Sequence, residues 1–330
     1  MKKSRFTSHA IAVASLSLSV LMLAGCAAGA PTSDKGDTGG AENESLAASV
    51  DLKGVDIIVG SKDYPEQRMV GEMQIAALKA AGANVTERIG LGGTAITREA
   101  MMTDQINMYT EYTGTAWGAI LTQTEVIRDG AELFDKVSAA DAENGVHWFD
   151  ASPYNNTFAV AGIQEVMDKH SIKTLSDYAK LVKSDPKAAT ICASSEFATR
   201  DDGIPGLEEA YGFSLANEYI VDQESNVSVV TMADQKQCNF TKADSTDPRA
   251  IPNGLGFLVD DKSFFPVYNP AVTMKESFYK ENAEQYDTLF NAIAALLDQE
   301  TILELNKLVQ VDGVPDKKVA EDFLREHNII

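Results

Sequence analysis

The residues best suited to bind a small molecule lie in the stretch 107–115, which reads NMYTEYTGT. Apolar and polar residues alternate along it, which predicts a short half-buried strand that ends at Gly114. The stretch gathers two rings and two hydroxyls at the strand end: Tyr109, Tyr112, Thr113 and Thr115. Small ligands bind at strand ends in open α/β sheets, and a ring beside hydroxyl donors suits a polar or cationic molecule. The alternative is a structural tyrosine whose ring fills the core.

A second candidate group lies at the start of a predicted helix. The run 54–60 (GVDIIVG) predicts a buried strand, and Pro65 suits the first turn of the helix that follows. Ser61, Lys62 and Tyr64 then lie at the helix N-terminus, where free amides and the helix dipole favour an anionic group.

Sequence patterns typical of enzymes are missing. We find no Gly-x-Ser-x-Gly, no His-Glu-x-x-His and no phosphate loop ending in Gly-Lys-Ser/Thr. The four histidines, at positions 9, 147, 170 and 327, do not have the spacing of metal ligands. We therefore expect no catalytic residues, no metal site and no cofactor.

The N-terminus has the pattern of a bacterial lipoprotein signal peptide. Three basic residues precede an apolar run of about 14 residues, and the sequence LAGC ends at Cys26. We expect removal of residues 1–25, lipid attachment at Cys26, and a flexible polar tether over 26–50. The apolar run is short of the roughly 20 residues that span a bilayer. The pattern predicts an extracytoplasmic protein that is lipid-anchored to the bacterial cell membrane.

Charge and cysteine content limit the partners. The formal net charge of −21 becomes −24 without the signal peptide, which argues against binding to nucleic acid or to anionic lipid. Beyond the lipidated cysteine, Cys192 and Cys238 remain. In an exported protein such a pair is compatible with a disulfide, and equally with two buried, inert thiols.

Strand and helix patterns alternate over most of the remaining chain. Strands are expected at 54–60, 85–89, 106–112, 146–149, 157–162, 190–193, 218–221 and 238–241, and 255–259 is apolar. Helices are expected from 65 to 80, from 94 to 102, up to 137, at 175–182, 206–211 and 229–237, and in three C-terminal stripes. Turn-rich stretches at 150–156 and 264–270 read as two crossings between lobes. The prediction is an α/β protein with two mostly parallel sheets: lobe 1 from 51–153 plus 265–330, and lobe 2 from 154–264.

An ordered set of motifs resembles one family, the substrate-binding lipoproteins of osmoprotectant ABC transporters for glycine betaine, choline and related compounds. The motifs are Ser61-Lys62-Asp63-Tyr64-Pro65-Glu66-Gln67, Leu91-Gly92-Gly93-Thr94, Glu111-Tyr112-Thr113-Gly114-Thr115, Asn155-Asn156-Thr157-Phe158, Ser195-Glu196-Phe197, Arg200-Asp201-Asp202-Gly203, Pro205-Gly206-Leu207, Phe264-Phe265-Pro266, Tyr268-Asn269 and Glu304-Leu305-Asn306. They cover nearly all of residues 54–330.

This resemblance implies a periplasmic-binding-protein-like fold with two hinge crossings, whose lobes close on a ligand and perform no chemistry. It also implies a permease and an ATPase as partners. Carried over residue by residue, an aromatic cage for a quaternary ammonium falls at Tyr112, Phe158 and Tyr268. The ligand's anionic or polar end falls at Lys62, Thr115 and Arg200, and two further motif positions are Thr94 and Asn156.

Two departures from the family pattern leave the ligand open. Phe158 stands where many relatives have tyrosine, and Asp244 stands where a further aromatic is expected. Asp244 is a counter-ion for a ligand such as choline, a hydrogen-bond partner for a hydroxyl-rich ligand, or a residue facing solvent. Tyr64 and Trp117 are spare aromatics, of which Trp117 fits a core position better. An uncharged solute such as a polyol, and an extracellular sensor with the same fold, remain alternatives.

Overall fold

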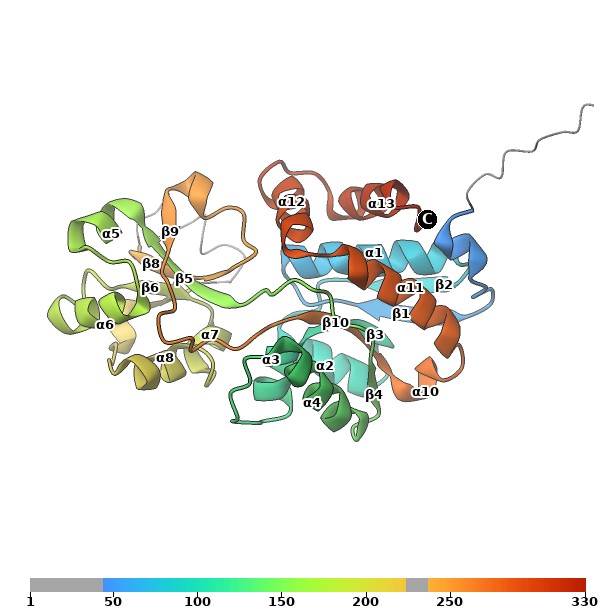
Figure 1. Ribbon diagram of the computed structural model, residues 1–330, viewed down its shortest axis with the longest axis horizontal. Helices are drawn as coiled ribbons and strands as arrows, with labels where there is room; N and C mark the ends of the chain where they lie inside the picture. Colours follow the sequence, from blue (N-terminus) through green and yellow to red (C-terminus); the bar gives the residue numbers. More distant parts are fainter. Residues whose placement is uncertain (1–43, 224–236) are drawn as a thin grey trace, which may run out of the picture. The chain divides into compact units, whose positions relative to one another are not determined.

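In a computed structural model of the chain, residues 44–223 and 237–330 are described (Figure 1). The predicted signal peptide, Cys26 and most of the predicted helix 229–237 lie outside these residues. Asn43–Ile330 forms one compact unit. Across the described residues, no helix is both long enough and apolar enough to span a membrane.

Lobe 1 is built on a five-stranded sheet in the order β2-β1-β3-β10-β4. Its strands are β1 (Asp56–Gly60), β2 (Asn84–Arg88), β3 (Met108–Tyr112), β4 (Val146–Trp148) and β10 (Pro270–Lys275). Its helices are α1 (Pro65–Ala80), α2 (Thr94–Met102), α3 (Thr113–Thr115), the π-helix η2 (Ala116–Ile120), α4 (Gly130–Ala142), α10 (Glu276–Tyr279), α11 (Ala283–Leu296), α12 (Gln299–Gln310) and α13 (Asp316–Glu326). Helices α1, α11, α12 and α13 gather on one side of the sheet, with α2 and α4 on the other (Figure 1).

Lobe 2 is built on a second five-stranded sheet in the order β7-β6-β8-β5-β9. Its strands are β5 (Phe158–Ile163), β6 (Ile191–Ala193), β7 (Ile220–Asp222), β8 (Phe240–Asp244) and β9 (Leu255–Phe257). Its helices are α5 (Gln164–His170), α6 (Leu175–Ser184), α7 (Ser195–Thr199), α8 (Ile204–Tyr211) and the 3-10 turns η3 (Asn217–Tyr219) and η4 (Ile251–Asn253). A disulfide joins Cys192 on β6 to Cys238, with the Cα atoms 5.8 Å apart.

Each sheet has four strands in one direction and one reversed strand. In lobe 1 the reversed strand is β10, antiparallel to β3 and β4, and in lobe 2 it is β5, antiparallel to β8 and β9. Both reversed strands directly follow a crossing between the lobes. The two sheets flanked by helices agree with the predicted fold class, but the sequence did not predict β10 or α5.

The prediction of a flexible tether up to residue 50 is wrong at its end. Leu46–Ser49 forms a 3-10 helix (η1) in which Ala47 is fully buried. The amides of Leu46 and Ala47 donate to the carbonyl oxygens of Asn328 and Ile329, at 3.0 and 2.8 Å. These short apolar residues therefore join lobe 1 at the C-terminus of the chain.

Candidate ligand-binding site

A cavity of about 500 Å³ lies between the two lobes, within the range of small-molecule sites. All nine residues that the sequence assigns to the ligand line it: Lys62, Thr94, Tyr112, Thr115, Asn156, Phe158, Arg200, Asp244 and Tyr268. Lobe 1 contributes the residues after β1 and β3 and at the start of α2, while lobe 2 contributes the start of β5, the end of α7 and the end of β8. The cavity therefore lies at strand and helix ends, as expected for an α/β sheet.

Aromatic rings line the cavity from both lobes. The ring centroids of Phe158 and Tyr268 are 4.8 Å apart, and the Phe197 ring meets Phe158 edge-on at 5.4 Å. From lobe 1, the rings of Tyr112 and Tyr64 stack at 6.3 Å. Trp117 does not line the cavity, because its half-buried ring packs against the core of lobe 1 and its Nε1 donates to the Glu125 carbonyl. Phe197, two residues after Ser195 in a family motif, is a ring that the sequence did not assign.

Lys62 is a buried ammonium held by lobe 1. Its Nζ lies 2.5 Å from Glu111 Oε1 and 3.1 Å from Thr94 Oγ1, and it is 5.5 Å from the centroid of the Tyr112 ring. The Glu111 carboxylate also accepts from the Tyr109 hydroxyl at 3.0 Å. Lys62 therefore reaches the cavity with its charge balanced by a fully buried acid.

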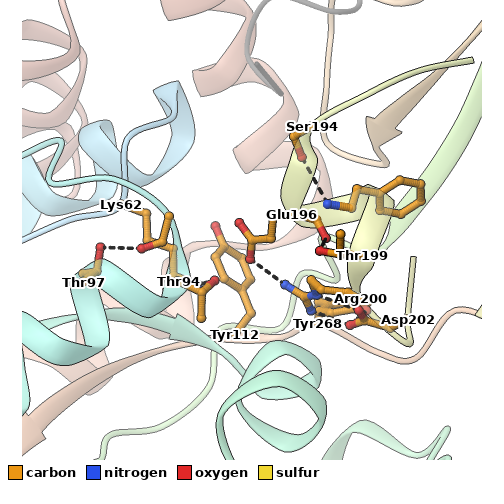
Figure 2. Close-up of polar contacts among 12 residues, drawn as sticks. Lys62, Thr94, Thr97, Tyr112, Ser194, Glu196, Thr199, Arg200, Asp202 and Tyr268 are labelled. Atoms are coloured by element: carbon orange, nitrogen blue, oxygen red, sulfur yellow. Dashed lines mark hydrogen bonds and ion pairs between the residues drawn. The ribbon is translucent and has the colours of Figure 1, made fainter. Parts of the chain in front are cut away.

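Arg200 is fixed by two acids of lobe 2. Its Nε donates to Asp202 at 2.6 Å and one terminal nitrogen donates to Glu196 at 2.9 Å. The hydroxyl of Tyr268 also donates to Asp202, at 2.7 Å. Burial opposes the charge of Arg200, but the hydrogen bonds to Asp202 outweigh it and raise its pKa. The same carboxylate thus holds both the guanidinium and a cage ring, and Figure 2 shows these groups beside Tyr112.

Glu196 is an acid of the cavity that the sequence did not assign. Burial acts to raise its pKa, but the charges of Lys62 and Arg200 outweigh burial and lower it, so the carboxylate is ionised. It reaches across to lobe 1, where a Cβ built on Gly93 would lie 3.1 Å from Glu196 Oε2. The sequence signal was its position four residues before Arg200, the C-cap of the same helix, because that spacing brings two side chains together.

Asp244 lines the cavity but is paired with a lysine. Lys242, which the sequence did not assign, donates to Asp244 from the same face of β8 and is itself buried. The Lys242 ammonium also lies 4.5 Å from the centroid of the Phe158 ring. Lys242 and Asp244 lie two residues apart on one strand, and this spacing predicts that their side chains share a face.

Asn156 lines the cavity with a side chain that is already hydrogen-bonded. Its amide donates to Glu66 at 3.0 Å, and its Oδ1 accepts from Thr246 at 2.7 Å.

Among the described residues, no group of three or more His, Cys, Asp and Glu side chains is placed to hold a metal ion.

Comparison with known proteins identifies the family. The model of the substrate-binding domain of ABC-type glycine betaine transport systems matches residues 55–326. The chain is 30% identical over 276 residues to the glycine betaine-binding protein YehZ of Escherichia coli, covering 81% of this chain and 89% of that protein. It is also 30% identical over 277 residues to a glycine-betaine-binding protein of Pseudomonas aeruginosa, covering 82% and 88%. The structure of apo YehZ from Escherichia coli aligns with a TM-score of 0.59 at 28% identity, over 83% of this chain and 99% of that one. The chain therefore belongs to the family of substrate-binding domains of ABC-type glycine betaine transport systems.

Proposed function

We propose that this protein captures a quaternary-ammonium osmolyte for an ABC importer, with glycine betaine as the first candidate ligand. The observation that carries the proposal is the set of rings around one cavity: Tyr112, Phe158 and Tyr268. A quaternary ammonium cannot donate hydrogen bonds, and each well-placed ring face attracts it by roughly 0.5 to 2 kcal/mol. Two relatives named for glycine betaine support the same choice.

The ligand carboxylate is assigned to the lobe 1 side of the cavity. A lysine ammonium has three N–H donors, and in Lys62 two of them point at Glu111 and Thr94. We assign the third N–H to the ligand, together with the hydroxyl of Thr115, which lines the same cavity. Three of the five N–H donors of Arg200 are held by Asp202 and Glu196, and we assign this residue to holding the Tyr268 side of the cage.

The pairing of Asp244 favours a zwitterion over choline. An acid that already forms an ion pair with Lys242 is not an unbalanced counter-ion for a ligand cation. A ligand that carries its own carboxylate needs no such counter-ion, so we expect glycine betaine to bind more tightly than choline.

We propose that the protein catalyses no reaction and that one lipid attaches it to the membrane. The relatives are binding proteins, and we expect lobe closure on the ligand without turnover. A lipid on Cys26 would keep the protein beside the permease and ATPase of its importer. Replacing Cys26 with serine should move the protein from the membrane fraction to the soluble fraction of cells, while retention in the membrane fraction would exclude this anchor.

The test is calorimetric titration of the mature chain, residues 26–330 with Cys26→Ser, against glycine betaine, choline, carnitine and an uncharged polyol. Saturable binding of glycine betaine, tighter than that of choline, supports the proposal. A preference for choline would contradict the zwitterion assignment. Binding of the polyol alone, or of none of the four, would contradict the cation cage.

A further inference from the structure

Glu66 is a buried carboxylate next to the cavity that accepts five side-chain hydrogen bonds. It lies in the first turn of α1 and is 3% exposed. Its Oε1 accepts from Tyr112 (2.7 Å), Tyr154 (3.1 Å) and Asn156 (3.0 Å), and its Oε2 accepts from Thr246 (2.7 Å) and Asn306 (2.7 Å). All five donors are neutral groups. A helix N-terminus needs acceptors for its own free amides, and none of these five donors is such an amide.

The donors come from parts of the chain that are far apart in sequence. Tyr112 ends β3 and Asn306 lies on α12, both in lobe 1, whereas Thr246 follows β8 in lobe 2. Asn306 also donates to the carbonyl oxygen of Thr246 at 3.1 Å. Glu66 therefore connects the two lobes at a point where Tyr112 and Asn156 also face the cavity.

We propose that Glu66 is a positioning residue for the ligand: it fixes the ring of Tyr112 through the hydroxyl and holds lobe 2 against lobe 1 through Thr246. The effect on ligand affinity rests on the proposed function, whereas the effect on the lobes does not. A protein binds more weakly when only a fraction of it has both halves of the site in place. Loss of the link between lobes should therefore weaken binding without removing any group from the cavity.

The hydrogen-bond pattern identifies Glu66→Gln as a conservative substitution. The single hydroxyl hydrogen of Thr246 lies within reach of both Glu66 Oε2 and Asn156 Oδ1, each at 2.7 Å, and Asn306 Oδ1 is buried without a partner among the described residues. In Glu66→Gln, the new amide can donate to Thr246, whose hydroxyl then donates to Asn156. The Asn306 amide can also turn its oxygen toward Gln, which costs its hydrogen bond to the carbonyl oxygen of Thr246. Glutamine should therefore preserve most of the network, and leucine should abolish it.

A matched pair of variants separates the link between lobes from general stability. Thr246→Val and Tyr154→Phe each remove one hydroxyl from Glu66. Tyr154 is the first residue of the segment predicted as lobe 2, but it packs in the core of lobe 1, so of these two hydroxyls only that of Thr246 comes from lobe 2. Spin labels at Lys180 in lobe 2 and Lys318 in lobe 1, both exposed, report the distance between the lobes by pulsed electron paramagnetic resonance.

We expect Thr246→Val and Glu66→Leu to broaden the distance distribution in the absence of ligand and to raise the Kd for glycine betaine. For Thr246→Val the increase should be about fivefold, the usual effect of one hydrogen bond. Glu66→Gln should stay within about twofold of the wild type on the same scale. Tyr154→Phe should lower the melting temperature and leave the distance distribution as it is.

Equal distance distributions in Thr246→Val, Tyr154→Phe and the wild type would overturn the proposal. A Glu66→Gln variant as impaired as Glu66→Leu would overturn it too, because the hydrogen-bond network would then not determine ligand affinity or the distance between the lobes. If the wild type fails to bind glycine betaine, the proposed function fails, but the distances measured without ligand still decide whether Glu66 joins the lobes.

Discussion

Tyr112 combines a ring on the cavity with a hydroxyl bound to Glu66, so truncation and hydroxyl removal have different effects. We expect Tyr112→Ala to weaken glycine betaine binding by about tenfold or more, because a desolvated ring contact is lost. Tyr112→Phe keeps the ring and should cost less. Calorimetry on both variants measures the difference, and an unchanged Kd in Tyr112→Ala would remove this residue from the site.

Lys242 determines whether Asp244 is available to a ligand. In Lys242→Met the ammonium leaves both Asp244 and the Phe158 ring, so an unbalanced carboxylate faces the cavity. We expect the ratio of glycine betaine to choline affinity to shift toward choline by about tenfold, the scale of one partly desolvated charge pair.

The matched control is the double variant Lys242→Met with Asp244→Asn, which removes both charges and should return the ratio toward that of the wild type. A ratio that does not change in the single variant would mean that Asp244 does not contact the ligand.

Glu66 also makes stability depend on pH. Burial, reinforced by the charge of Asp244, raises its pKa, although hydrogen bonds from Asn306, Thr246 and Tyr112 oppose the shift. The folded chain then holds the proton more tightly than the unfolded chain, so the free energy of unfolding falls as pH rises from about 4.5 through the raised pKa. Urea unfolding of the wild type and Glu66→Gln at several pH values tests this. The free energy of unfolding of the wild type should fall relative to that of Glu66→Gln as pH rises. A difference between the two proteins that stays constant with pH would contradict this prediction.

At the scale of elements, the junction between β3 and α3 depends on a glycine. A Cβ on Gly114 would lie 2.6 Å from the carbonyl oxygen of Val267 and 2.8 Å from the Tyr268 ring. Backbone cannot move aside as a flexible side chain can, so Gly114→Ala should destabilise the fold by roughly 1 to 3 kcal/mol and displace a cage ring.

Gly118→Ala on η2 is the control, because nothing lies within 4 Å of its added Cβ. Thermal unfolding and titration with glycine betaine measure both effects. Equal melting temperatures in the two variants would show that the β3–α3 junction tolerates a side chain.

Elements with strong local signals were predicted from sequence, and those defined by distant contacts were not. The glycine-bounded run before Pro65 predicted β1 and α1 because hydrophobic pattern and capping agree there. β10 was missed because its sequence, PAVTMK, follows directly on the predicted crossing 264–270, and its place in the sheet comes from pairing with β3 and β4.

In the ligand-binding site, too, residues defined by distant contacts were not predicted. The family motifs named nine residues that line the cavity, but Glu66 and Lys242 were not assigned. The significance of Glu66 lies in donors up to 240 positions away, and a sequence read alone does not bring those donors together.

At the scale of the whole molecule, the two lobes differ in how the chain builds them. Lobe 2 is formed by one continuous segment, whereas the sheet of lobe 1 contains β10, which follows lobe 2 in the chain and lies between β3 and β4. We expect a chain that stops at residue 264 to fold lobe 2 but not lobe 1, because β4 has no partner without β10. Amide hydrogen exchange should then show protection in β5, β6 and β8 and none in β1–β4. Protection of β1–β4 in the shortened chain would contradict this.

The inserted strand also has a consequence for maturation during secretion. A chain that crosses the membrane N-terminus first delivers β1–β4 early, yet their sheet stays open between β3 and β4 until β10 arrives. If the chain is exported in this way, as its signal-peptide pattern predicts, we expect the first half to stay unfolded on the outer face of the membrane while lobe 2 and its disulfide form. Lobe 1 is thus expected to become able to bind a ligand only after β10 has been delivered.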